Sequence, residues 1–424
     1  MLTLGERTPN FAQADVLVDD GKVAEIGPGL RARDAEHVDA TDTVVMPGFV
    51  DTHRHASRSL QRNLGSKASG PTSAVSFTQP EDLYAATLIG LLGAVEAGIT
   101  TVVDWSDVPA GADFADAALQ AHRDAGVRTV FVRTVDLARD GGATLTRQEL
   151  GSLVEAAGPF TSIALGFELG PGGTEGMAEH WVTARGTSMS IQLHAGRHTR
   201  PEAISQAGDR GLLGPDVTLV HGPGLDVTSI DALAGSGASV SLAPASEMAG
   251  GLGSPPIQQL VDRRLRPGLG VDDERIAPGD MFAQMRATIS FQHATVFDRK
   301  LAGKAGLPRL MSTRDVIRFA TVDGARVAGL GRVTGSLERG KQADIVVLRT
   351  DRPNVYPIND PIGAVVWGMD TSNVDWVLTG GRVLMRGGRL EADAERARAI
   401  ATSAGQRMAG AAGLVVGAAR GVDG

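Results

Sequence analysis

The residues best suited to chemistry are two histidines at the end of an apolar segment. His53 and His55 close the run V-V-M-P-G-F-V-D-T-H-R-H, whose β-branched start predicts a buried strand. Side chains two residues apart share one face of a strand, so both imidazoles point the same way. Two neutral imidazoles on one face can chelate zinc or iron. Because H-x-H is a short pattern that also arises by chance, an ordinary polar strand end is the alternative for this pair alone.

Composition limits what else could hold a metal ion. The chain has 424 residues, nine histidines and no cysteine, so any ligands must come from His, Asp or Glu, and a Cys nucleophile is excluded. A formal net charge of -8, without a basic cluster that contains aromatics, argues against a nucleic-acid partner. No apolar run approaches the roughly 20 residues of a membrane span, and the first residues do not resemble a signal peptide. We therefore expect a cytoplasmic protein with a small-molecule partner, no nucleic acid and no membrane.

Helix and strand patterns alternate through the middle of the chain. Strand patterns follow one another at I-T-T-V-V-D-W, V-R-T-V-F-V-R-T, S-I-A-L-G-F-E-L, S-M-S-I-Q-L-H, V-T-L-V-H, A-S-V-S-L-A and R-P-G-L-G-V-D-D, with helix patterns between them. The clearest helices are expected over residues 80–98, 112–125, 147–157, 175–185, 227–233 and 257–263. With the strand that ends at His53, this makes eight strands separated by helices. The pattern predicts an α/β fold, a (β/α)8 TIM barrel, rather than an open doubly wound sheet.

Both ends of the chain carry β patterns. Residues 14–27 read as a hairpin around Asp-Asp-Gly, and a short strand is expected near residues 37–39. Residues 335–348 and 374–388 show the same strand and hairpin pattern. We infer a small β-sandwich built from both chain termini that flanks the barrel. The expected domains are the composite sandwich of residues 1–47 and 333–395, the catalytic barrel of residues 48–332 and a helical tail of residues 396–424.

Three further strand ends carry side chains that can ligate a metal. They are His194 in I-Q-L-H-A-G-R, His221 in V-T-L-V-H-G-P and Asp272 in L-G-V-D-D. In a TIM barrel the C-terminal ends of the strands converge on one face, where barrel enzymes place their chemistry. Ligand-type residues at four of eight strand ends are improbable by chance, so the sequence predicts a metal site at that face.

These motifs resemble the amidohydrolase superfamily, and within it the branch of cytosine deaminases, guanine deaminases and triazine hydrolases. The resemblance covers nearly the whole chain, from A-D-V-L-V-D-D-G-K-V-A-E-I-G through P-G-F-V-D-T-H-R-H to G-S-L-E-R-G-K-Q-A-D-I-V-V-L. It implies one divalent metal ion held by His53, His55, His194 and Asp272, with zinc the first choice and iron the second. It also implies that His221 contacts the metal-bound water or the substrate, and that the chain forms a homo-oligomer.

The chemistry of these residues agrees with that implied role. Three imidazoles and one carboxylate leave a divalent ion a net positive charge and an open position, so a bound water ionises near neutral pH. Asp272 would take a proton from that water and pass it to the leaving group, and His221 would stabilise the developing negative charge. We expect hydrolysis of a C–N bond by metal-bound hydroxide: deamination of an aminated heterocycle or amidine, or hydrolysis of a cyclic amide.

One position departs from the pattern of the superfamily. Deaminases of this branch carry a glutamate three residues after the histidine of the fifth strand, where this chain has Arg197. A guanidinium cannot act as a general acid or base. Arg197 could bind a substrate carboxylate or phosphate, help neutralise an oxyanion, or turn outward. The arginine keeps open a lyase or isomerase that uses His and Asp as acid and base, and also a non-catalytic ligand binder, although four intact metal ligands argue against the latter.

Three other side chains are candidates for substrate binding. Gln61 follows the first motif, where relatives contact substrate. Trp105 ends the second barrel strand and could stack on a planar substrate, although an aromatic residue there is as often plain packing. Glu168 lies near the end of the fourth strand, where some two-metal relatives place a bridging ligand; a structural carboxylate paired with an arginine is the alternative. The polar segment of residues 67–76 is expected to be a mobile loop over the site.

Overall fold

The structure is a computed structural model that describes residues 1–62, 77–106, 111–135, 145–169, 174, 177–196, 199–200 and 202–411. The expected loop at residues 67–76 and the candidate Arg197 lie outside the described residues. Among the described helices, none has both the length and the apolar character that crossing a membrane requires.

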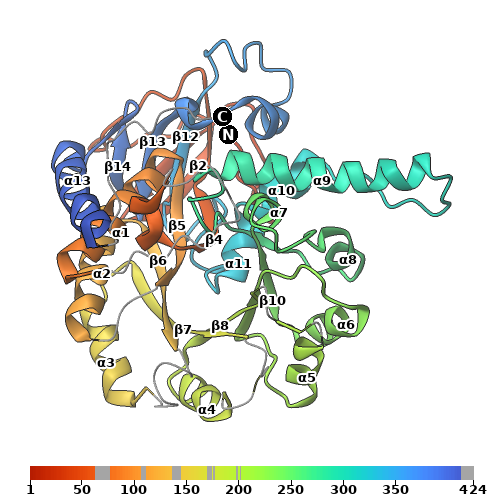
Figure 1. Ribbon diagram of the computed structural model, residues 1–424. Helices are drawn as coiled ribbons and strands as arrows, with labels where there is room; N and C mark the ends of the chain where they lie inside the picture. Colours follow the sequence, from red (N-terminus) through yellow and green to blue (C-terminus); the bar gives the residue numbers. More distant parts are fainter. Residues whose placement is uncertain are drawn as a thin grey trace, which may run out of the picture.

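Eight parallel strands form the centre of the molecule (Figure 1), in the order β4 to β11. The last strand joins the first through the backbone of Asp272, whose N–H donates to the His53 carbonyl (2.7 Å) and whose carbonyl accepts from the His55 N–H (3.0 Å). These bonds close the sheet and confirm the predicted barrel. The strands are β4 (Phe49–Arg54), β5 (Ile99–Ser106), β6 (Arg128–Val135), β7 (Thr161–Glu168), β8 (Ser190–His194), β9 (Val217–Val220), β10 (Ser239–Leu242) and β11 (Gly268–Leu269).

Helices surround this barrel at the predicted places. Local signals set their ends: Thr146 and Glu149 form a capping box on α3, and Asp226 caps α6 by accepting from the Ser229 N–H (2.7 Å). The expected helices are α1 (Pro80–Glu96), α2 (Ala112–Ala125), α3 (Arg147–Ala156), α4 (Ala178–Gly186), α5 (Ala203–Asp209), α6 (Val227–Ser236) and α8 (Ile257–Asp262). Among the described residues, five α-helices had no counterpart in the sequence analysis: α7 (Pro244–Ala249), α9 (Met281–Leu301), α10 (Thr313–Phe319), α11 (Val322–Val327) and α12 (Pro361–Gly363).

Helix α11 closes the N-terminal end of the barrel. Its Ala325, and Ala328 directly after it, pack against an apolar layer from the strands, formed by Val50, Val103, Val130, Val132 and Ala164 together with Trp105. The Val50 N–H donates to the Ala320 carbonyl (2.9 Å), which ties the first strand to the start of this segment. Burial of apolar surface, worth roughly 25 cal/mol per Å², therefore stabilises this end of the barrel.

The two chain termini meet in a small β structure beside the barrel. A hairpin of β1 (Asp15–Asp19) and β2 (Lys22–Gly27) turns at Asp20 and Gly21, which both have positive φ, as expected for Asp-Gly. Apolar residues of this hairpin pack with others from β3 and β12 in one cluster, so the predicted composite sandwich is confirmed. The second sheet is antiparallel and contains β3 (Thr43–Pro47), β12 (Ile345–Arg349), β13 (Val374–Thr379), β14 (Arg382–Arg386) and β15 (Arg389–Leu390).

Two details of the predicted sandwich are wrong. Residues 37–39 form no strand; this segment is exposed, and the strand that enters the sheet is the buried β3. In the segment of residues 335–348, only the end is a strand, because β12 begins at Ile345, and Gln342 makes an isolated bridge to Lys22. At residues 37–39 exposure explains the missing strand, whereas residues 335–337 are buried and still form no strand.

Two further helices complete the fold. Helix α13 (Ala394–Ala411) lies beside α1 (Figure 1), and its Arg407 forms a 2.6 Å ion pair with the buried Asp82 of α1. Helix α9 extends from the barrel to one side of the molecule (Figure 1). Its start is held by Asp280, which accepts from the Ala283 N–H (2.8 Å).

Candidate metal centre and active site

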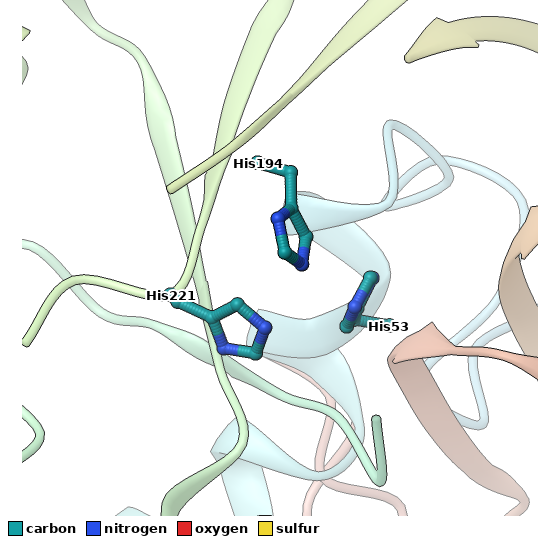
Figure 2. Close-up of side chains that lie close together, drawn as sticks. All are labelled: His53, His194 and His221. Carbon is teal, nitrogen blue, oxygen red and sulfur yellow. The ribbon is translucent and has the colours of Figure 1, made fainter. Parts of the chain in front are cut away.

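Three histidine rings from three strand ends meet at the C-terminal mouth of the barrel. His53 lies in β4, His194 ends β8, and His221 follows β9. Figure 2 shows the three rings turned toward one another. The ring centroid of His53 is 5.3 Å from that of His194 and 5.1 Å from that of His221, and the latter two are 4.8 Å apart. The parallel barrel thus brings together residues that are far apart in the sequence.

Asp272 enters the same space through the closure of the barrel. Its Oδ1 is 3.4 Å from Nε2 of His53 and 3.4 Å from Nε2 of His55. Potential ligand atoms of His53, His55 and Asp272 all lie within 4.8 Å of one another, and the same holds for His53, His194 and His221. The predicted ligand residues and His221 therefore form one cluster.

This cluster has the properties of a metal site. His53 is 1% exposed, and neither of its ring nitrogens has a hydrogen-bond partner among the described residues. A buried polar atom without a partner costs roughly 1–3 kcal/mol, which a ligated cation would offset. Histidine nitrogens and a carboxylate oxygen are also the donors that zinc prefers when thiolates are absent. The residues present fit a divalent metal ion.

The electrostatics of the cluster favour the ligand forms of these side chains. Burial lowers the pKa of His53 and of His194, so both imidazoles are neutral at neutral pH. Burial alone would raise the pKa of Asp272, but the surrounding histidines, His221 first, hold it well below its usual value. Burial would likewise lower the pKa of His221, but the carboxylates of Asp272 and Glu247 outweigh it and raise that pKa. Asp272 is therefore ionised and can accept a proton.

Two residues of α7 that the sequence analysis missed contact this cluster. Oε1 of Glu247 lies 2.9 Å from Nδ1 of His221, and both side chains are buried. The Ser246 hydroxyl donates to Oδ2 of Asp272 (2.5 Å). A signal for both was present, because P-A-S-E directly follows the seventh barrel strand, on the face where barrel enzymes place functional residues.

The predicted substrate-binding residues occupy different positions around the cluster. Glu168 ends β7, with Oε2 2.9 Å from Nδ1 of His194 and a side chain that is 56% exposed. Trp105 is only 4% exposed and packs behind the ligands, with its ring 5.0 Å from that of His194. Gln61, at the end of the 3-10 helix Ala56–Gln61, is buried and accepts from Nη1 of Arg275 (3.2 Å). Arg197 lies outside the described residues.

Charged residues next to the ligands in the sequence form further ion pairs and hydrogen bonds. Arg54, the last residue of β4 and the residue between His53 and His55, is fully buried. Its Nε donates to Oδ2 of Asp51 (2.7 Å), and Nη2 donates to the Gly279 carbonyl (2.7 Å). Asp273, next to Asp272, accepts from Nε of Arg275 (2.9 Å). Both residues therefore belong to ion-pair networks that fix the strand ends.

Comparison with known proteins identifies relatives of this chain in sequence and in fold. The model of the family described as "Amidohydrolase family" matches residues 44–384. The chain is 29% identical to a 5-methylthioadenosine/S-adenosylhomocysteine deaminase of Haloarcula marismortui over 91% of each chain. It is 26% identical to a 5'-deoxyadenosine deaminase of Methanothermobacter thermautotrophicus, which covers 89% of this chain and 91% of the relative. An adenosine deaminase of Xanthomonas campestris with bound zinc has the same fold, with a TM-score of 0.76, 21% identity and 93% of each chain covered.

The family match extends over most of the barrel and into the β-sandwich, and the archaeal relatives are similar over nearly their full length. These findings confirm the resemblance on which the sequence analysis relied, and they favour hydrolysis over the lyase or isomerase alternative. The chain belongs to the amidohydrolase family, and it is a hydrolase that acts on C–N bonds other than peptide bonds.

Proposed function

We propose that this protein is a mononuclear, metal-dependent deaminase that hydrolyses the exocyclic C–N bond of an aminated heterocycle. One observation supports this proposal most strongly: four potential ligands and His221 converge at the C-terminal mouth of the barrel, with the nitrogens of His53 unpartnered among the described residues. Hydrolysis of a cyclic amide uses the same groups and is the second candidate.

His53, His55, His194 and Asp272 would hold the metal ion. When bound there, a divalent ion supplies the positive charge that lets a water molecule ionise near neutral pH. Zinc is our first choice because the donors are nitrogen and oxygen and because a neighbour with the same fold contains zinc. Iron is the alternative.

Asp272 is the proposed proton carrier. Its Oδ1 faces His53 and His55, whereas its Oδ2 faces His221, 3.8 Å from Nε2. Oδ2 is thus placed to accept a proton from the attacking water and to donate it to the departing amine. His221 presents Nε2 to the same space, where this nitrogen, once protonated, would stabilise negative charge that develops on the substrate.

The relatives indicate which substrates to test first. They are named as deaminases of 5'-deoxyadenosine, 5-methylthioadenosine and S-adenosylhomocysteine. We propose an adenine nucleoside with a modified 5' position, or a similar aminated heterocycle. Glu168, half exposed beside His194, is the proposed contact to the substrate from the described residues. Gln61 and Trp105, both buried, would shape the pocket wall, and Arg197 is proposed to face an anionic group of the substrate.

A panel assay tests this proposal. The purified protein is incubated with adenosine, 5'-deoxyadenosine, 5-methylthioadenosine, S-adenosylhomocysteine, cytosine, guanine and a cyclic amide, and ammonia release and ring opening are measured. We expect ammonia from at least one aminated heterocycle and none from Asp272→Asn. Ring opening without ammonia would establish the cyclic-amide candidate instead, and turnover by Asp272→Asn at the wild-type rate would contradict the proposed mechanism.

The remaining expectations are also proposals. We propose that residues 48–332 form the catalytic domain, that residues 1–47 and 333–395 form the sandwich domain and that residues 396–424 form a tail. We also propose a cytoplasmic location, and the family resemblance supports a homo-oligomer. Light scattering coupled to size-exclusion chromatography measures the mass in solution, and a mass of one chain would contradict the oligomer.

A further inference from the structure

We infer that Ser246 and Glu247, consecutive residues of the short helix α7, are positioning residues for the reaction: Glu247 orients His221, and Ser246 orients Asp272. This inference rests on the proposed function for the roles of His221 and Asp272. It goes beyond it by naming the residues that hold both groups in place.

The first contact fixes the ring of His221. Oε1 of Glu247 accepts from the Ala243 N–H (3.0 Å) and lies 2.9 Å from Nδ1 of His221, so the carboxylate is held by the backbone and in turn holds the ring. A hydrogen bond to Nδ1 places the ring hydrogen there, and Nε2 is left toward Asp272. Glu247 therefore sets both the orientation and the tautomer of His221.

The second contact fixes the carboxylate of Asp272. The Ser246 hydroxyl donates to Oδ2 of Asp272, the oxygen on the side of His221. Oδ1 remains directed at His53 and His55. Ser246 therefore keeps the two oxygens of one carboxylate in two different environments, one toward the ligands and one toward the proposed proton transfer.

The backbone explains why such anchors are needed. His221 and Asp272 both have left-handed φ values, +65° and +64° respectively. A non-glycine residue rarely adopts this conformation, so the surrounding structure must stabilise it. Adjacent residues on a helix point about 100° apart, so one turn can reach two separate side chains. Helix α7 begins at Pro244, two residues after β10, and the Glu247 N–H donates to the Ala243 carbonyl (2.8 Å), which ties this turn to the strand end.

A second buried histidine shows what a purely structural pair looks like. His122 of α2 has Nε2 2.9 Å from Oδ2 of Asp104 and Nδ1 2.9 Å from the hydroxyl of Thr129, so both ring nitrogens are used inside the fold. Glu247 engages only one nitrogen of His221, and the other faces the ligand cluster. This difference indicates that Glu247 orients the other nitrogen of His221 toward the ligand cluster and does more than stabilise packing.

The kinetic test separates positioning from simple stability. Glu247→Leu removes the acceptor at similar volume, and we expect kcat to fall about 10- to 100-fold, with KM changed less than about threefold. Glu247→Gln keeps an oxygen acceptor and should recover most of kcat. Ser246→Ala should lower kcat in the same direction, and Ser246→Thr, which keeps the hydroxyl, should restore it.

A control variant shows what loss of stability alone does. Asp344→Asn alters another buried carboxylate, which is bound to Arg128 away from the site (2.7 Å). It should lower Tm and leave kcat unchanged. A kcat loss in Asp344→Asn equal to that in Glu247→Leu, or wild-type kcat in Glu247→Leu, would overturn the inference.

A second readout does not depend on activity. Nitrogen-15 NMR of histidine-labelled, metal-free protein reports which ring nitrogen carries the hydrogen, and His221→Gln identifies the signal. We expect the Nδ1–H form in the wild type and in Glu247→Gln, and its loss in Glu247→Leu. The Nε2–H form in the wild type would overturn the inference even if Glu247→Leu does not fold. A wild type without C–N hydrolysis but with the Nδ1–H form would refute the proposed function and leave the orientation of His221 by Glu247 standing.

Discussion

The two ends of the barrel are built from the same strands but by opposite physical rules. At the N-terminal end, Val50 and Val132 pack with residues of the α11 segment in an apolar layer. At the C-terminal end, β4, β8 and β9 and the segment after β11 present histidines and a buried aspartate, and two of these residues, His221 and Asp272, have left-handed backbone conformations. Burial of apolar side chains stabilises the first end. At the second end, burial of polar groups costs free energy, and these groups form the proposed active site.

This contrast predicts whether a substitution at each end changes stability or turnover. A change of Val50 or Val132 at the apolar end should alter stability and leave turnover intact. Trp105 belongs to the same layer but is an exception, because its ring lies 5.0 Å from that of His194. A change at the polar end should alter turnover more than stability, because those groups are arranged around a ligand rather than around one another.

The largest effect is expected for Asp272→Asn. An amide keeps the volume but replaces one carboxylate oxygen with an NH2 group. It cannot accept a proton, nor can it both accept from Ser246 and present an oxygen to His53 and His55, so kcat should fall by roughly 10²- to 10⁴-fold. Steady-state kinetics on the substrate found in the panel assay measures this. Circular dichroism should show an unchanged fold, and a variant with wild-type kcat would remove Asp272 from the mechanism.

Metal removal should have the next largest effect. Chelation would leave the buried nitrogens of His53 without a ligand, so activity should be lost and Tm should fall; a ligand at 100 times its Kd stabilises by about 2.7 kcal/mol. Calorimetry before and after chelation measures the shift, and added zinc should reverse it. A Tm that does not respond to chelation would show that the cluster is stable without metal.

Glu168→Gln should have a moderate effect. The carboxylate lies beside His194 but is half exposed, and solvent weakens such an ion pair. We expect kcat/KM to fall about 2- to 10-fold, mostly through KM. Metal content, measured in parallel, should stay at the wild-type value, and loss of the metal would instead identify Glu168 as essential to the ligand cluster.

At the opposite end, Val132→Ala should leave activity unchanged. The side chain is fully buried, so its loss should lower the free energy of unfolding by about 1–3 kcal/mol. Denaturant unfolding and kinetics on the same preparation test both parts. A large fall in kcat with normal stability would contradict the proposal that the apolar end determines stability and the polar end determines turnover.

The sequence predicted the barrel because its signals are local. Each strand is a short apolar run, and caps such as Thr146 and Asp226 mark helix starts, so periodicity located most elements to within a few residues. The predicted ligand residues could be listed because each follows a strand. The approach of Asp272 to within 4.8 Å of His53 and His55 needed the closure of the barrel onto β4, which no local pattern contains.

What the sequence did not show depends on tertiary contacts. Glu247 and Ser246 follow a strand, but only the fold reveals that they reach His221 and Asp272. The exposed segment of residues 37–39 has a strand-like pattern and no sheet to join. Trp105 could be read as a stacking surface until its burial behind the histidines was known.

Elemental analysis of the purified wild type beside His53→Ala is the direct test of the proposed metal centre. We expect about one zinc or iron per chain in the wild type and its loss in the variant, since His53 lies in both groups of potential ligands. A wild-type protein that contains no metal and gains none from added zinc would contradict the proposed metal centre, and with it the proposed hydrolysis.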